Sequence, residues 1–72
     1  MTRTIGYVPV RVGRETVSIP VEIEPTAATR VDFEGRAARI VVSDELGEDA
    51  RHDAVAAVLP EVQTYLARKL LN

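Results

Sequence analysis

The sequence predicts one α+β domain, in which two antiparallel β-hairpins form a small sheet or barrel and a C-terminal amphipathic helix follows. Three observations support this prediction. Apolar residues alternate with polar ones through much of the first half, two Gly-Arg pairs interrupt the alternation, and helical spacing replaces it after residue 47. We therefore treat residues 1–72 as a single domain, with a β-hairpin half at 1–43 and a helix at 44–72.

The first hairpin is expected to turn at Gly13-Arg14. A two-residue type II′ turn requires Gly at its first position. With the turn there, Val10 lies opposite Val17 and Val8 lies opposite Ile19, so the apolar residues share one face of the sheet. A slip of one residue would move them to the other face, which makes this register self-consistent.

The second hairpin is expected to turn in the same way at Gly35-Arg36. This register places Phe33 opposite Ala38 on the apolar face. On the polar face it places Asp32 opposite Arg39, which is a favourable cross-strand charge pair.

Pro9 and Pro20 fall at non-hydrogen-bonded positions of the first hairpin. Their missing N–H groups therefore point away from that pairing. We expect each proline to limit further pairing on the outer edge of its own strand.

Residues 48–71 are expected to form the helix, with acidic residues in its first turn and Arg68 and Lys69 near its C-terminus. Pro60 lies inside this segment and predicts a kink in an otherwise continuous helix. The apolar stripe of the helix could cover the sheet of its own chain or dock on another chain. As a partner or dimer interface, the stripe would contribute Val55, Leu59, Val62, Leu66 and Leu70.

The length and composition favour a small homo-oligomer, and a dimer is the simplest case. A chain of 72 residues is marginal as a monomer, and without Cys it has no disulfide or Cys-ligated metal to stabilise it. No apolar run approaches a membrane span, and the first residues contain no signal-peptide pattern. The sequence therefore predicts a cytoplasmic protein without membrane contact.

The charge is unevenly distributed along the chain. Residues 1–42 hold six Arg and five acidic residues, whereas residues 43–72 hold three basic and six acidic residues. Arginines on the polar strand face and at the turns could contact phosphates. These candidate DNA-binding residues are Arg11, Arg14, Arg30, Arg36 and Arg39. The alternative is a solvated face on which Asp32 and Glu22 neutralise the arginines.

Catalytic chemistry is not expected. His52 lies one helical turn from Glu48, so a metal site is conceivable, but such sites usually recruit ligands from more than one element. Neither Ser18 nor Ser43 has the sequence context of a hydrolase nucleophile. We therefore predict no enzyme activity, no catalytic residues, no metal and no cofactor.

Two stretches, "TVSIPVEI" at residues 16–23 and "VDFEGRAARIVV" at 31–42, resemble the AbrB/MazE-like swapped-hairpin family. The matching positions are Val17, Ile19, Pro20, Glu22, Ile23, Val31, Phe33, Arg39, Ile40 and Val41. The resemblance covers about residues 8–42. It implies a dimer of interleaved hairpins that binds DNA through Arg residues, with a tail that could neutralise a toxin.

Together these observations predict a small non-enzymatic, homodimeric DNA-binding regulator or antitoxin-like protein. The sheet half would contact duplex DNA, and the helix would contact a partner protein or the other subunit. The alternative is a protein-interaction adaptor, or a small structural subunit of a larger assembly, with no DNA contact.

Overall fold

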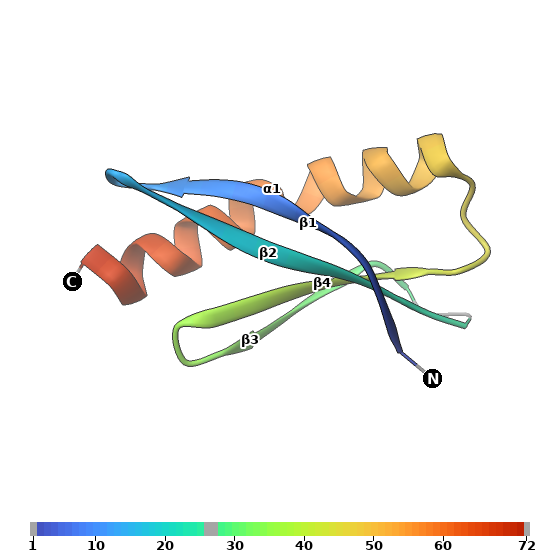
Figure 1. The fold of residues 1–72 in the computed structure, drawn as a ribbon, viewed down its shortest axis with the longest axis horizontal. Coiled ribbons are helices and arrows are strands. Elements are labelled where there is room, and N and C mark those ends of the chain that lie inside the picture. Colours follow the sequence, from blue (N-terminus) through green and yellow to red (C-terminus); the bar gives the residue numbers. More distant parts are fainter. Residues whose placement is uncertain (1, 26–27, 72) are drawn as a thin grey trace.

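In a computed structural model, the protein folds as an open four-stranded sheet followed by one helix (Figure 1). The structure describes residues 2–25 and 28–71. The elements are β1 (Arg3–Val12), β2 (Glu15–Glu24), β3 (Arg30–Glu34), β4 (Ala37–Ser43) and α1 (Glu48–Leu71). The strand order is β1-β2-β4-β3, and the α+β class predicted from the sequence is confirmed.

β1 and β2 pair antiparallel in the predicted register. Val10 lies opposite Val17, and Val8 lies opposite Ile19. Gly13 opens the turn with φ of 62°, a left-handed conformation that glycine adopts without steric cost. Near its start, β1 contains a bulge between Thr4 and Gly6 that shifts the register.

β3 and β4 also pair antiparallel as predicted, with Phe33 opposite Ala38 and Asp32 opposite Arg39. Gly35 has φ of 58° and occupies the same turn position as Gly13. The two Gly-Arg pairs therefore have equivalent places in the backbone. Residues 26 and 27, between β2 and β3 in the chain, lie outside the described residues.

The sheet is mixed, which corrects the prediction of an antiparallel sheet or barrel. Residues 21–24 of β2 pair in parallel with residues 40–43 of β4, and β3 takes the edge. The physical reason lies in Ile40, Val41 and Val42, which are all fully buried. An apolar run without alternation needs cover on both faces, which a central strand provides.

Pro20 marks the point where β2 and β4 separate. The hydrogen bond from Asp44 N to Glu24 O, at 3.2 Å, shows that even-numbered residues of β2 direct their backbone groups toward β4. Pro20 belongs to this set and has no N–H, so the pairing with β4 begins only at Val21. Beyond this point the two strand pairs diverge toward their turns (Figure 1).

α1 covers the apolar face of the sheet. Val62 and Leu66 are fully buried against strand residues that include Ile19 and Ile40. The helix is continuous through Pro60, which lies on its exposed side. A kink at Pro60 remains a prediction.

The second half of α1 is fastened to both strand pairs of the sheet. Gln63 Nε2 donates a hydrogen bond to Arg11 O on β1, at 2.9 Å. Tyr65 stacks on Phe33 with ring centroids 4.0 Å apart, and its hydroxyl donates to Gly35 O at 2.8 Å. These contacts fix the helix across the gap between the diverging strand pairs.

The turn glycines generate the first prediction. Replacing either Gly13 or Gly35 with Ala forces a side chain into the left-handed region, which costs about 1–2 kcal/mol. We expect both variants to unfold at lower urea concentration than the wild type, as measured by circular dichroism. Gly35→Asn should lose less stability than Gly35→Ala, because Asn tolerates a positive φ better than Ala does. Equal losses for the Asn and Ala variants would contradict the assigned turn geometry.

Candidate nucleic-acid interface

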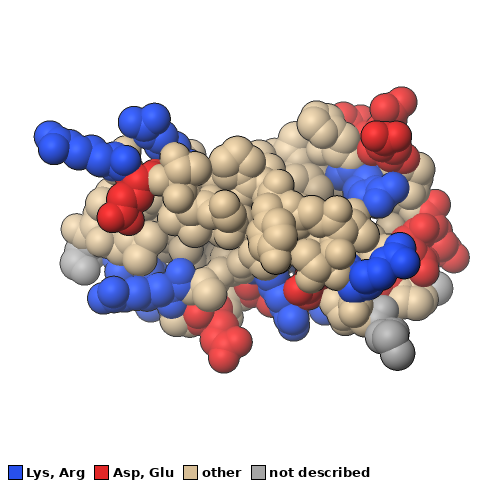
Figure 2. Space-filling view, viewed as in Figure 1, with Lys and Arg blue, Asp and Glu red and all other residues tan. Residues whose placement is uncertain are grey.

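Both turns and the C-terminus of α1 lie at one end of the molecule, and basic side chains project from this end (Figures 1 and 2). We call it the basic end. It carries Arg11, Arg14, Arg36, Arg68 and Lys69. The opposite end holds the first turn of α1 with Glu48 and Asp49, and acidic side chains gather there (Figure 2).

Arg14 and Arg36 owe their positions to the turn glycines before them. A two-residue turn projects its second side chain into solvent, and both arginines are exposed. Arg11 is also exposed, and its Nε lies 3.5 Å from Gly13 O, at the limit of a hydrogen bond. These three arginines stand where the sequence predicts them.

Arg68 and Lys69 come from the helix and join the basic end only through folding. Lys69 Nζ lies 5.6 Å from the centre of the Tyr65 ring, a cation–π distance. The last residues of α1, Leu70 and Leu71, line a hollow together with Arg14 of the first turn. The end of α1 therefore lies against the first turn, and its cations complement the negative end of the helix dipole.

The five basic side chains of this end form no ion pair with any residue in the described ranges 2–25 and 28–71. Three acidic residues lie on the same part of the molecule, namely Glu15, Glu34 and Glu61. The basic end thus has a local excess of positive charge on a protein whose net charge is −2.

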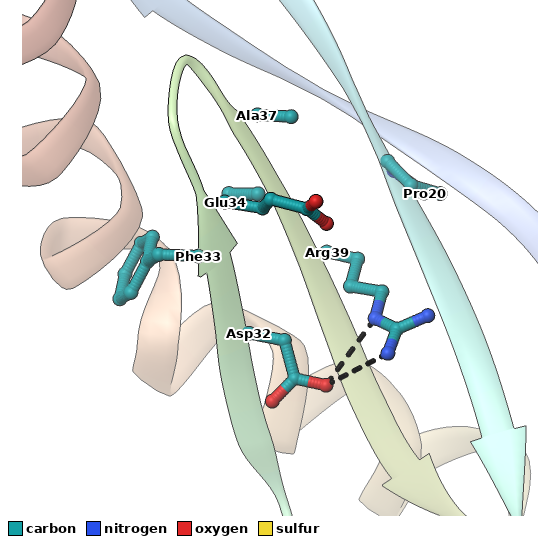
Figure 3. Close-up of a pocket in the computed structure, with 7 residues that line it drawn as sticks. Pro20, Asp32, Phe33, Glu34, Ala37 and Arg39 are labelled. Atoms are coloured by element: carbon teal, nitrogen blue, oxygen red, sulfur yellow. Dashed lines mark hydrogen bonds and ion pairs between the residues drawn. The ribbon is translucent and has the colours of Figure 1, made fainter.

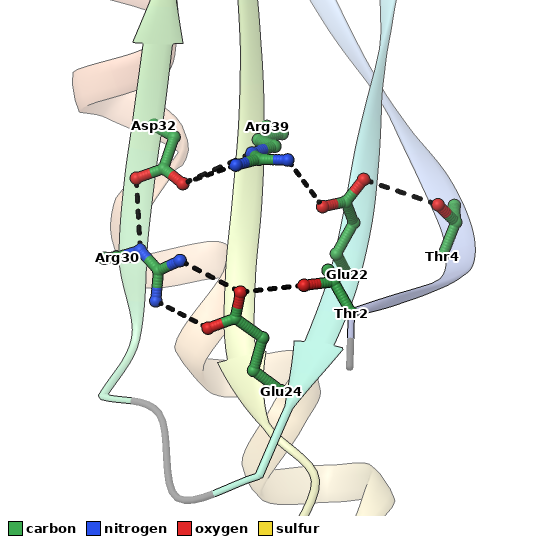
Figure 4. A network of polar contacts seen from close by, with 7 residues as sticks. All are labelled: Thr2, Thr4, Glu22, Glu24, Arg30, Asp32 and Arg39. Carbon is green, nitrogen blue, oxygen red and sulfur yellow. Dashed lines mark hydrogen bonds and ion pairs between the residues drawn. The ribbon is translucent and has the colours of Figure 1, made fainter.

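The other two predicted arginines are engaged on the outer face of the sheet (Figure 4). Arg30 binds Glu24 at 3.0 Å and Asp32 at 3.1 Å. Arg39 binds Glu22 and Asp32, each at 3.2 Å.

Two threonines at the start of the chain extend this polar network to the β1 edge of the sheet. Thr2 Oγ1 donates to Glu24 at 2.9 Å, and Thr4 Oγ1 reaches Glu22 at 3.4 Å. The network therefore contains three carboxylates and two guanidinium groups, so its own charge is negative. This is the neutralised face that the sequence left open as the alternative to phosphate contact.

The network also covers an apolar residue. Val41 is fully buried although it faces away from Ile40, Val42 and the helix. Its neighbours in register are Glu22 on β2 and Arg30 on β3. The aliphatic parts of these paired side chains can shield Val41 from water, since long charged residues bury their stems.

The ion pairs shift the protonation equilibria of the network. The Arg30 guanidinium, which hydrogen-bonds to both carboxylates, holds the pKa of Glu24 and of Asp32 below their ordinary values. The hydrogen bonds to Glu24 and Asp32 in turn raise the pKa of Arg30. These groups are therefore all charged at neutral pH.

A hollow of about 300 Å³ opens where β2 and β4 diverge (Figure 3). Pro20 lines one side, and Ala37, Ala38 and Arg39 line the other. Glu34 extends across β4 toward this hollow (Figure 3), and it forms no ion pair with a described residue.

The residues predicted for a partner interface lie on the inner side of α1. Val62 and Leu66 are fully buried in the core of their own chain. Val55, Leu59 and Leu70 are partly buried against the same core. The helix thus covers its own sheet, and a contact with a second chain through these five residues remains a prediction.

His52 is exposed and lines a hollow between α1 and the start of β1, together with Glu48 and Ile5. Within residues 2–25 and 28–71, no group of three or more His, Cys, Asp or Glu side chains is arranged to hold a metal ion. The helix of this described part is also not apolar enough to cross a membrane.

Sequence reasoning missed Arg68 and Lys69 as members of the basic end. It interpreted them only as complements of the helix dipole. Their place beside the turns follows from the path of α1 across the sheet, which no local pattern encodes.

The comparisons with protein-family models, with curated proteins and with solved structures all find no match for this chain.

The network predicts a loss of stability in acid. Because the pKa values of Glu24 and Asp32 are lower in the folded than in the unfolded protein, the ion pairs contribute fully above the unfolded values. We expect the urea midpoint to fall as the pH drops below about 4 and through the lowered folded values.

Arg30→Gln removes the main cause of both shifts. It should lower the urea midpoint at neutral pH and flatten its fall in acid. Arg36→Gln, which removes an arginine outside the network, serves as the control. If Arg30→Gln and the wild type lost stability in parallel over this pH range, the network would not be the cause.

Proposed function

We propose that this protein is a small, non-enzymatic, homodimeric DNA-binding regulator that contacts phosphates through its basic end. The observation that carries the proposal is the convergence of Arg11, Arg14, Arg36, Arg68 and Lys69 on one end, without ion pairs among the described residues. Cations that no carboxylate neutralises can replace the counterions that surround a nucleic-acid backbone.

The shape of this end supports phosphate contact. Two exposed turns, each with an Arg at its second position, flank the helix C-terminus (Figure 1). Such projecting side chains can follow a ridge of phosphates, and phosphate contacts position a protein without reading base sequence. The AbrB/MazE-like resemblance implies DNA contact through Arg residues and agrees with this proposal.

The polar network reduces the number of arginines that are available to contact DNA. Arg30 and Arg39 would have to leave their carboxylate partners before they could bind phosphate. We therefore place the DNA contact at Arg11, Arg14 and Arg36, with Arg68 and Lys69 added. An antitoxin-like role of the helix rests on the resemblance alone.

A fluorescence anisotropy titration against labelled duplex DNA at several salt concentrations tests the proposal. Each phosphate contact contributes roughly 0.9 to the slope of log K against log salt. We expect the double variant Arg14→Gln/Arg36→Gln to reduce this slope by about two and to weaken binding to all sequences alike.

The matched control is Arg3→Gln/Arg51→Gln, which removes two arginines from the opposite end of the molecule. It loses the same charge and should leave the slope close to the wild-type value. No binding at low salt, or an equal effect of the two double variants, would overturn the proposal.

The adaptor function is a second candidate, and the hollow between β2 and β4 favours it. Beyond Pro20 the backbone edge of β2 is unpaired with β4, so an extended peptide segment could add to it. A Lys or Arg of that segment would meet Glu34. Pro20→Val would restore the missing N–H and allow β2 and β4 to pair further, which should abolish such binding.

A further inference from the structure

The two outer edges of the sheet differ in how open they are to another strand. On β1, the bulge between Thr4 and Gly6 interrupts the edge near its start. Pro9 directs its missing N–H outward, and the Gln63 side chain occupies the outward carbonyl of Arg11 at 2.9 Å. These are devices by which proteins block an edge strand.

The edge formed by β3 has none of these devices. Glu34 lies opposite Ala37 across the two-residue turn, so Val31 and Phe33 fall at the positions whose N–H and C=O groups point away from β4. The pairing of β3 with β4 has no bulge, and no side chain of residues 2–25 or 28–71 hydrogen-bonds to these outward groups. In Figure 1 β3 forms the margin of the sheet, and no other described strand pairs with its outer edge.

We propose that β3 pairs antiparallel with β3 of a second copy, about a two-fold axis at Asp32, and that this contact forms the dimer. The inference deepens the proposed function, on which it rests for the homodimer, by assigning the interface. Two-fold symmetry requires one surface to be complementary to itself, and the sequence of β3 meets this requirement.

The charges of β3 match in this register. Arg30 lies opposite the partner's Glu34, and Glu34 lies opposite the partner's Arg30. The partner's Arg30 would thereby bring a positive charge beside Glu34, which forms no ion pair among the described residues of its own chain. Asp32 meets the partner's Asp32, but Arg30 and Arg39 already compensate its charge at 3.1 and 3.2 Å.

The helix-side face of β3 matches as well. Val31 lies opposite the partner's Phe33, an aromatic–β-branched pair of the kind that stabilises sheets. Val31 and Phe33 are only partly buried within one chain. Next to Phe33, a hollow of about 390 Å³ lined by Pro60 and Tyr65 remains open.

Other registers of the same pairing are less favourable. A shift of the axis from Asp32 to Phe33 would place Asp32 opposite the partner's Glu34 twice, with like charges in contact. A shift to Val31 would leave Glu34 outside the paired segment. Only the register about Asp32 pairs all residues of β3.

The pairing would place the two basic ends on opposite sides of the axis. Arg36 lies in the turn, one rise beyond Glu34 and so about three rises from Asp32, which would put the two Arg36 positions roughly 20 Å apart along the strands at about 3.4 Å per residue.

Sedimentation equilibrium of the full chain without nucleic acid tests the pairing. We expect the wild type to show a monomer–dimer equilibrium. Val31→Pro removes an outward N–H that β4 does not use, so it should abolish the dimer while circular dichroism shows a folded sheet. A wild type that stays monomeric at every concentration, or a Val31→Pro variant that dimerises normally, would overturn the proposal.

A charge reversal tests the register independently of any effect of Val31→Pro on folding. Glu34→Lys places Lys opposite the partner's Arg30 in two symmetric contacts, and should raise the dimer dissociation constant by about tenfold. Glu15→Lys makes the same change beside the other turn and should leave the constant unchanged. Equal constants for the two variants would overturn the register.

These outcomes are separate from the DNA titration. A protein that dimerises as described but does not bind duplex DNA would overturn the proposed function alone. A monomer that binds DNA through the basic end would overturn the β3 pairing alone.

Discussion

The parallel contact between residues 21–24 and residues 40–43 is the one on which the rest of the structure depends. Each antiparallel strand pair alone would be marginal in water, because two strands cannot bury an apolar face. Joined through β2 and β4, they form one surface that α1 covers with Val62 and Leu66. The same contact brings Glu22 and Glu24 close to Arg39 and Arg30, so the polar network on the outer face exists only in the joined sheet.

This arrangement divides the arginines into two groups with different roles. Arg30 and Arg39 lie on the two strands of the β3–β4 pair and are held by carboxylates from two strands, β2 and β3. The arginines of the turns extend beyond the sheet, and the acidic residues near them do not pair with them. The basic end is therefore a better candidate for binding an anionic ligand than the outer face of the sheet. Because the net charge of the whole chain is negative, the positive charge of the basic end would attract an anionic ligand to that end rather than to the rest of the surface.

Prolines and edges control which strands can still accept a neighbour. Pro20 ends the β2–β4 pairing and opens the hollow between the strand pairs, whereas Pro9 protects the edge of β1. β3 carries no such protection, although it is short and charged on its outer face. Backbone groups that can still pair with another strand are therefore found at the edge of β3 and in the hollow between β2 and β4. A second copy could add a strand at the first place, and a partner peptide could add one at the second.

The sequence by itself determined the local structure. Period-two alternation around Gly13 and Gly35 defined both antiparallel registers, because a slip would expose every apolar residue, and the 3.6-residue spacing defined the helix. Tertiary structure decided the parallel joining of β2 with β4, although the uninterrupted run Ile40-Val41-Val42 was a readable sign of a central strand. It also decided that Arg30 and Arg39 pair with carboxylates while Arg68 and Lys69 join the turn arginines. These outcomes depend on distances between residues far apart in the chain, and alternation within a segment carries no information about them.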